Sequence, residues 1–227
     1  MWLLRLYRST IGKKAIMAVT GLMMVAFVIG HMVGNLQVFI GPAKMNGYAA
    51  FLKSTGELLW LVRIGLVVAV LLHILMAWQL TRIKASARSL DYVMRTPQAS
   101  TTASRTMRWG GVLLLVFIVF HILHFTTGTL FSYASRSDAQ YTGFSASDVY
   151  GNVISGFRVP WVVGFYLVSM FFLLLHLFHG AWSSVRTLGL TKASQHPLHR
   201  PVATVIAVVV WVGFSAIPVA VFLGVIR

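Results

Sequence analysis

Five long apolar runs alternate with short polar segments along the 227-residue chain. Each run reaches or exceeds the roughly 20 residues that an α-helix needs to cross a bilayer. The pattern predicts transmembrane helices over residues 15–40, 58–80, 109–133, 159–185 and 202–226. The polar segments 89–106 and 132–158 are expected to be loops, and neither resembles a separate domain. We therefore expect an all-α membrane protein with one transmembrane domain spanning residues 1–227.

Composition supports a multi-pass membrane protein. The chain is 58% hydrophobic and only 10% charged, with a mean hydropathy of +0.81, whereas soluble domains carry about 25% charged residues. The first apolar run is too long for a signal peptide and lacks a small-residue cleavage site, so we expect it to stay in the membrane. The absence of cysteine excludes disulfides, iron–sulfur clusters bound by this chain and thioether-linked haem.

The net charge of +15 lies mostly at one end of the apolar runs. In a soluble protein such a charge would suggest nucleic acid; here we expect anionic lipid or a partner protein, and no nucleic acid. Of the 19 basic residues, 13 fall on one side of the predicted helices, which predicts a cytoplasmic N-terminus and an external C-terminus. These 13 are Arg5, Arg8, Lys13, Lys14, Arg82, Lys84, Arg88, Arg95, Arg105, Arg108, Arg186, Lys192 and Arg200.

Histidines are the main ionisable side chains within the apolar runs. Six of the eight lie in the first four predicted helices: His31, His73, His121, His124, His176 and His179. An ionisable residue at membrane depth is costly and indicates a functional site. A single one is often only an interhelical hydrogen-bonding residue. His196 and His199 lie outside the first four helices and receive no role.

The depth of each histidine follows from the helical rise of about 1.5 Å per residue, counted from the nearest cytoplasmic basic residue. The estimates are about 14 Å for His73, about 15 Å for His176, about 20 Å for His121 and about 25 Å for His31. The four histidines thus form two levels, each with one histidine from each of two helices. Two bis-histidine haems stacked inside a four-helix bundle need this arrangement.

Several alternatives stay open on depth alone. His124 matches the level of His31 slightly better than His121 does, and His179 lies one turn from His176. Metals other than haem fit poorly, because the four acids all lie outside the apolar interior: Glu57, Asp91, Asp138 and Asp148. Small residues one turn after two of the histidines, Ala77 and Gly180, leave room for a porphyrin.

Four segments carry a family resemblance: STIGKKAIMAVTGLMMVAFVIGHMVGNLQVF, RIGLVVAVLLHILMAWQL, SRTMRWGGVLLLVFIVFH and HLFHGAWSSVRTLGL. They resemble the five-helix, di-haem cytochrome b membrane anchor, of the cytochrome b558 family, found in succinate:quinone oxidoreductases and quinol:fumarate reductases. The resemblance covers about residues 9–189. It implies His31 and His121 as axial ligands of the haem distal to the cytoplasm, and His73 and His176 as those of the proximal haem.

The resemblance also implies partners and a mechanism. A flavoprotein subunit with FAD and an iron–sulfur subunit would dock on the cytoplasmic side of a bacterial inner membrane. Electrons from succinate would reach a quinone, usually menaquinone in five-helix members. A trimer of complexes is compatible with the resemblance. The docking surface would be basic, from Arg5, Arg8, Lys13, Arg82, Lys84 and Arg88, although these residues also set topology.

The remaining site residues are weaker candidates. Haem propionates need cationic or hydroxyl donors, and Arg105, Arg108 and Ser183 lie near the level of the proximal haem. His124 and His179 would either contact a propionate or a ligand histidine, or be packed polar residues without a role at the haems. For a quinone on the outer side, Glu57 would handle protons, unless it is simply a solvated acid. For one on the inner side, the candidates are Ser9, Arg88 and Tyr92.

Four other functions remain open on the sequence. The chain could be the di-haem anchor of a hydrogenase or formate dehydrogenase, or a cytochrome that acts alone. It could belong to a fumarate reductase that runs in the opposite direction. It could also be a haem-free anchor or transporter whose histidines bind substrate.

Overall fold

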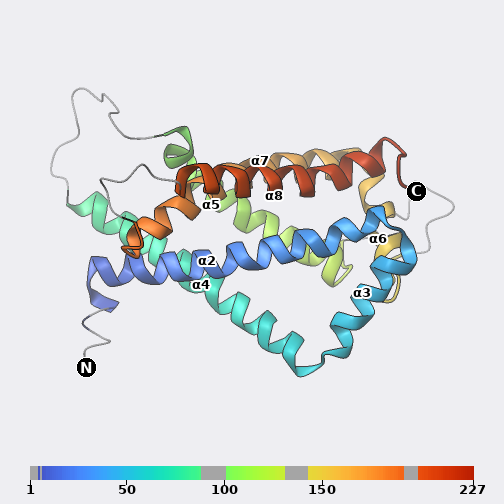
Figure 1. Cartoon of the computed structure of the whole chain (residues 1–227), viewed down its shortest axis with the longest axis horizontal. Coiled ribbons are helices and arrows are strands. Elements are labelled where there is room, and N and C mark those ends of the chain that lie inside the picture. Colours follow the sequence, from blue (N-terminus) through green and yellow to red (C-terminus); the bar gives the residue numbers. More distant parts are fainter. Residues whose placement is uncertain (1–4, 6, 88–100, 131–142, 192–198) are drawn as a thin grey trace.

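The computed structural model describes residues 5, 7–87, 101–130, 143–191 and 199–227. Over these residues it is all-helical and contains no strand. Five helices are long and apolar enough to cross a membrane, which confirms the predicted pattern. They are α2 (Thr10–Asn35), α4 (Glu57–Ser86), α5 (Thr102–His121), α7 (Pro160–Thr187) and α8 (His199–Phe222). All five extend along the length of the molecule, and the N- and C-termini lie at opposite ends (Figure 1).

Local sequence signals fix where the long helices begin. The Ser9 side chain caps α2 by accepting a hydrogen bond from the Gly12 backbone N–H, at 2.9 Å. Thr101 and Ser104 form a reciprocal capping box at the start of α5. Pro160 occupies the first turn of α7, where a missing N–H is harmless. Because of the capping box, α5 begins at Thr102, and the prediction of a loop over 89–106 is wrong for its last residues.

Two shorter helices were not predicted and lie at the end of the molecule that carries the C-terminus (Figure 1). They are α3 (Pro42–Ser54) and α6 (Val149–Phe157), so the predicted loop over 132–158 is partly helical. Hydrogen bonds join them, because the Asn46 side chain donates to the Asp148 carboxylate at 2.9 Å and accepts from the Tyr150 N–H at 2.9 Å. Together they cover the end of the bundle that the charge distribution predicts to be external.

Two of the long helices change form near that end. After α2 the chain continues as a 3₁₀-helix, η1 (Leu36–Phe39), and after α5 as a π-helix, η2 (Ile122–Thr126). Single-turn π segments are rare and occur often at functional sites. The π-helix of this chain starts directly after His121 and contains His124.

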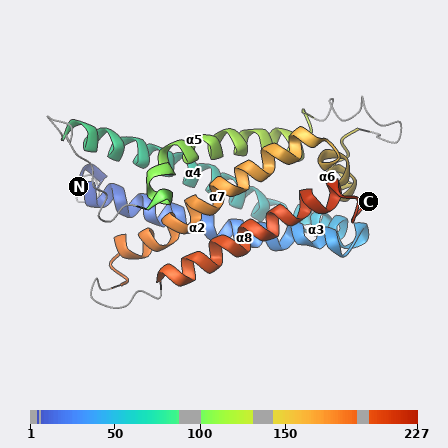
Figure 2. The same cartoon turned by 90° about the horizontal axis from the view of Figure 1, so that it is seen from above.

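The long helices pack in a definite order. Helix α2 packs against α4 and α7, and α7 also packs against α5 and α8. Figure 2 shows α5 and α8 on opposite sides of α7. Among the described residues, neither α2 with α5 nor α4 with α7 is a closely packed pair. Side chains that meet across these pairs therefore span the interior of the bundle.

The apolar core is concentrated around α7 and α8. One cluster includes Met32, Leu177, Ala207 and Val210 from α2, α7 and α8. A second cluster at the end covered by α3 and α6 includes Val38, Met45, Ile154, Phe157 and Val162. Helix α4 has only two buried residues, Ala69 and Met76. Of the long helices, α4 is thus the one least covered by the rest of the protein.

Candidate functional site

The four predicted ligand histidines meet as two pairs. The rings of His31 on α2 and His121 on α5 have centroids 5.8 Å apart, with an interplanar angle of 86°. The rings of His73 on α4 and His176 on α7 have centroids 6.2 Å apart, at 55°. Each pair joins two helices that do not pack closely, and the two pairs lie at different levels along the bundle. The structure thus brings together the residues that depth and the family resemblance paired.

The ring separations fit two imidazoles on opposite faces of one metal ion. A metal–imidazole nitrogen bond is about 2 Å, by analogy with zinc, and the ring centroid lies about 1 Å farther on. Two opposed imidazoles would then have centroids about 6 Å apart, which is the separation of both pairs. At Gly180, one turn after His176, an added Cβ would meet no atom within 4 Å. The donor set and spacing therefore suit two bis-histidine haems.

His73 is oriented by the backbone of α2. Its Nδ1 lies 3.0 Å from the Met17 carbonyl oxygen and 3.3 Å from the Thr20 hydroxyl oxygen. A carbonyl oxygen can only accept, so Nδ1 carries the proton and donates it. The neutral ring then has its lone pair on Nε2, the nitrogen available to a metal. Metal-binding histidines are commonly fixed in this way by a hydrogen bond from the other ring nitrogen.

A close approach between α2, α4 and α7 also positions His73. A Cβ added to Gly21 would lie 3.3 Å from His73 Cε1 and 3.8 Å from the Ser184 hydroxyl oxygen. Only a glycine on α2 leaves the imidazole its full space at this point. A hydroxyl close to Gly21, on the side of the inner pair (His73 and His176), belongs to Ser184, the residue that follows the predicted Ser183.

His176, the partner of His73, has a buried nitrogen without a protein partner. Among the described residues, its Nδ1 makes no hydrogen bond and is inaccessible to solvent, and the same holds for Nδ1 of His179. Buried polar atoms are nearly always paired, and leaving one unpaired costs about 1–3 kcal/mol. The unpaired nitrogen of His176 is therefore consistent with a partner that comes from outside this chain.

The outer pair, His31 and His121, is held in place by other side chains. His121 Nδ1 lies 3.1 Å from the Tyr166 hydroxyl oxygen. His31 stacks on Phe27 with centroids 5.3 Å apart, and the Asn35 amide nitrogen lies 3.3 Å from each nitrogen of the His31 ring. Phe117 stacks on His121 at 5.6 Å. Aromatic faces and side-chain hydrogen bonds thus restrict both rings.

The two additional histidines occupy different surroundings. His124, in the π-helix, is completely buried, and its Nδ1 lies 3.0 Å from the same Tyr166 hydroxyl oxygen. A Cβ on Gly156 of α6 would come within 2.8 Å of His124 Nε2, so this ring packs directly against α6. His179 packs edge-on against Trp182, with ring centroids 5.4 Å apart.

Other predicted site residues are placed at the helix ends. Glu57 is exposed at the first turn of α4, and Ser9 is the cap of α2. Arg105 and Arg108 are exposed near the start of α5, at the same end of the bundle as the half-buried Ser183. Arg88, Tyr92 and His196 lie outside the described residues, and the side chain of His199 is not described either.

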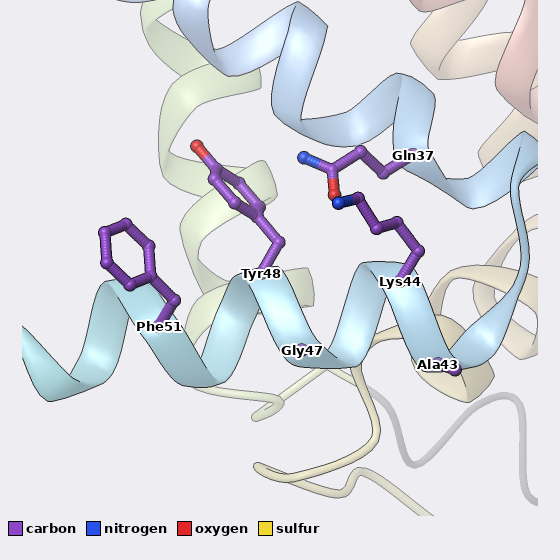
Figure 3. Close-up of a pocket in the computed structure, with 6 residues that line it drawn as sticks. All are labelled: Gln37, Ala43, Lys44, Gly47, Tyr48 and Phe51. Carbon is purple, nitrogen blue, oxygen red and sulfur yellow. The ribbon is translucent and has the colours of Figure 1, made fainter.

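A pocket of about 330 Å³ opens between η1 and α3, at the covered end of the bundle. Figure 3 shows the side chains of Gln37, Lys44 and Tyr48 directed toward the same hollow, with Phe51 beside it. The Tyr48 ring also packs against Gly34, where an added Cβ would be 2.7 Å from Cε1 of that ring. The pocket therefore lies one helical turn beyond His31. Glu57 is not among its lining residues.

Sequence reasoning missed the residues that orient the histidines. Tyr166 and Thr20 are isolated polar side chains in apolar runs, and Asn35 lies one turn after His31. Polarity in an apolar run and an i+4 spacing were signals that could have identified them. Gly21 and Ser184 gave no such signal, because their role depends on how three helices approach one another.

Comparison with known proteins found no match to this chain among protein-family models, curated proteins or solved structures. The site is therefore interpreted from its own residues. Two pairs of imidazoles span the interior of an apolar helix bundle at two levels. That arrangement can hold two six-coordinate haems in series across a membrane.

Proposed function

We propose that this chain is the di-haem cytochrome b membrane anchor of a succinate:quinone oxidoreductase in a bacterial cytoplasmic membrane. The observation that carries the haem proposal is the pairing of four histidines at two levels, across helices that do not pack closely. His73 and His176 would hold the haem nearer the cytoplasm, and His31 and His121 the other. The choice of succinate rests on the resemblance of the four sequence segments to that family.

The histidine pairs define what each haem could do. When bound by two histidines, haem iron has no open position and supplies one-electron transfer. The chain keeps the imidazoles neutral by enclosing them in apolar surroundings, which also lowers the cost of placing them in a membrane. The Met17 carbonyl and the Tyr166 hydroxyl each contact Nδ1 of one ring in a pair, so that Nε2 of His73 and of His121 would be the nitrogens that bind iron.

The partner subunits would carry out the dicarboxylate chemistry. A flavoprotein with FAD and an iron–sulfur subunit would dock at the basic end, where Arg82 and Lys84 lie on the last turns of α4. This chain would contribute the docking surface, the haem ligands and part of the quinone site. The exposed apolar side chains of α4, such as Leu61, Ile64 and Leu71, suit contact with lipid.

We propose that the pocket between η1 and α3 receives the quinone head group, and that the quinone is menaquinone. Its volume of about 330 Å³ lies at the lower end of the range for small-molecule sites. Lys44, Gln37 and Tyr48 offer hydrogen-bond donors to quinone oxygens, and Phe51 offers an aromatic wall. This location favours the outer of the two predicted quinone sites, although Glu57, the acid predicted for that site, does not line the pocket.

Purification of the chain from its native membrane tests this function. We expect two further subunits, one with flavin and one with iron–sulfur clusters, and succinate-dependent reduction of a menaquinone analogue. Complexes containing His73→Ala should keep succinate oxidation by a soluble dye but lose quinone reduction. Co-purification with a hydrogenase or formate dehydrogenase instead would reject the succinate assignment and keep the haem proposal.

A further inference from the structure

Tyr166 contacts two histidines at once, and only one of them is a proposed haem ligand. Its hydroxyl oxygen lies 3.1 Å from His121 Nδ1 and 3.0 Å from His124 Nδ1. The Tyr166 side chain is 5% exposed and His124 is completely buried. Both hydrogen bonds are therefore formed away from water, where the low local dielectric makes a hydrogen bond stronger.

The aromatic surroundings hold the Tyr166 ring in place. It makes edge-on contacts with Phe117 and Phe157, at centroid separations of 5.0 Å and 4.9 Å. The π-helix after His121 contains His124, whose Nδ1 reaches the same hydroxyl. The tyrosine hydroxyl thus contacts two imidazoles that come from successive parts of the chain.

The direction of the two hydrogen bonds follows from the chemistry of the three groups. A neutral imidazole has one N–H, so if His121 binds iron through Nε2 its proton is on Nδ1. That proton can only be donated to the Tyr166 oxygen. The single Tyr166 O–H is then available for the acceptor nitrogen of His124, which requires the His124 proton on Nε2.

We propose that Tyr166 and His124 form a hydrogen-bond relay that orients His121 and tunes the outer haem. The relay makes Tyr166 a positioning residue: it accepts from His121 and, by donating to His124, becomes a better acceptor. A stronger acceptor at Nδ1 increases electron donation from Nε2 to iron and favours the ferric state. The inner haem has a different device, since His73 donates to a backbone carbonyl that no side-chain substitution removes. The inference rests on the proposed haem ligation.

The test is a redox titration of both haems in the purified complex with Tyr166→Phe, which keeps the ring and removes the hydroxyl. Loss of such a contact to a metal-binding histidine typically changes metal affinity about 10–100-fold. We expect at least a roughly tenfold loss of preference for the ferric state at the outer haem alone, which is a rise of about 59 mV in its midpoint potential. The haem whose potential rises should be the one that His31→Ala removes.

Two further variants keep the test specific. His124→Phe preserves an aromatic ring in the cluster but removes the acceptor of the Tyr166 proton, and should raise the same potential by a smaller amount. Tyr150→Phe removes a hydroxyl that donates to the Arg227 carbonyl oxygen at 2.9 Å and contacts neither histidine pair, and it should leave both potentials unchanged.

Two results would overturn the relay. One is two haems at unchanged potentials in both Tyr166→Phe and His124→Phe; the other is an equal shift of both haems. If Tyr166→Phe does not assemble, an unchanged outer potential in His124→Phe overturns it. A wild-type protein without haem would instead reject the proposed function itself, so the two failures are distinguishable.

Discussion

His73 and His121 are each oriented by a hydrogen bond, but the two bonds involve different kinds of group. His73 donates to a main-chain carbonyl on the neighbouring helix, whereas His121 faces a tyrosine hydroxyl. A carbonyl is a fixed acceptor, while a hydroxyl can donate or accept and responds to its own partner. The inner site is therefore defined mainly by the approach of α2 to α4, and the outer site mainly by side-chain identity.

Replacement of Gly21 should disturb the inner pair selectively. In Gly21→Ala the new Cβ would lie 3.3 Å from His73 Cε1, a tight contact that pushes on the imidazole held beside Met17. We expect about tenfold weaker retention of the inner haem, the lower end of the effect of losing such support. Haem content and reduced-minus-oxidised spectra after mild detergent washing measure this.

The matched control lies on the same helix. A Cβ at Gly30 would meet no atom within 4 Å, so Gly30→Ala should leave both haems in place. Equal haem content in the two variants would show that the approach of Gly21 to His73 does not matter for binding.

The four paired histidines could be predicted from the sequence and its family resemblance, but the residues that orient them could not. A histidine in an apolar run is visible from polarity alone, and the helical rise then gives its depth. The contact of Tyr166 with His121 joins residues 45 positions apart. It depends on the rotation of α7 against α5, which the pattern of apolar residues does not determine, because these helices are apolar around most of their surface.

At the level of elements, the π-helix and α6 depend on each other. The π-helix buries His124, and α6 covers it with Gly156, so that a side chain at this position would overlap the imidazole. Helix α6 begins at an Asp148 cap and carries five buried residues over its length, including Val153 and Phe157. Helix α6, part of the cover over this end of the bundle, thus packs directly on the buried His124.

Gly156→Ala should loosen this cover. Its Cβ would come within 2.8 Å of His124 Nε2 and 3.1 Å of Phe125 Cε1. Overpacking of this kind costs about 1–3 kcal/mol, which exceeds the gain of up to about 1 kcal/mol in helix propensity. Thermal unfolding in detergent should therefore show a lower midpoint than wild type.

Gly164→Ala provides the comparison, since an added Cβ on that α7 residue meets no atom within 4 Å. It should be as stable as wild type or slightly more so. Equal stability of the Gly156 and Gly164 variants would contradict the close packing of α6 on His124.

The five long helices followed from apolar length, whereas α3 and α6 did not. Both short helices have fewer residues than a membrane crossing needs, so the length of the apolar runs does not predict them. Local signals were present for α3: Gly41 with φ +119° precedes Pro42 at its first turn, and Gly56 with φ +53° follows it. For α6 the signal was the Asp148 cap, which a composition rich in Ser, Gly and Asp obscured.

For the whole molecule, the distribution of basic residues predicts orientation. An excess of Lys and Arg is typical of the cytoplasmic end, so we expect the N-terminus inside and the α3–α6 cover outside. The chain has no cysteine, so single cysteines can report on each side without background. Ser54 at the end of α3 and Ser86 at the end of α4 are both exposed and suit this purpose.

In intact cells, Ser54→Cys should react with a membrane-impermeant maleimide. Ser86→Cys should react only after the membrane is permeabilised. The reverse pattern would place the basic end outside and would be incompatible with docking of cytoplasmic partner subunits there.

The central claim is that the two histidine pairs hold one haem each. The most direct test is the haem b content and low-spin spectrum of the purified wild-type chain and of its His31→Ala and His73→Ala variants. We expect two haems in wild type and one in each variant, with the remaining haem differing between the two variants in its spectrum and midpoint potential. A wild-type protein without haem b, or two variants that retain the same haem, would contradict it.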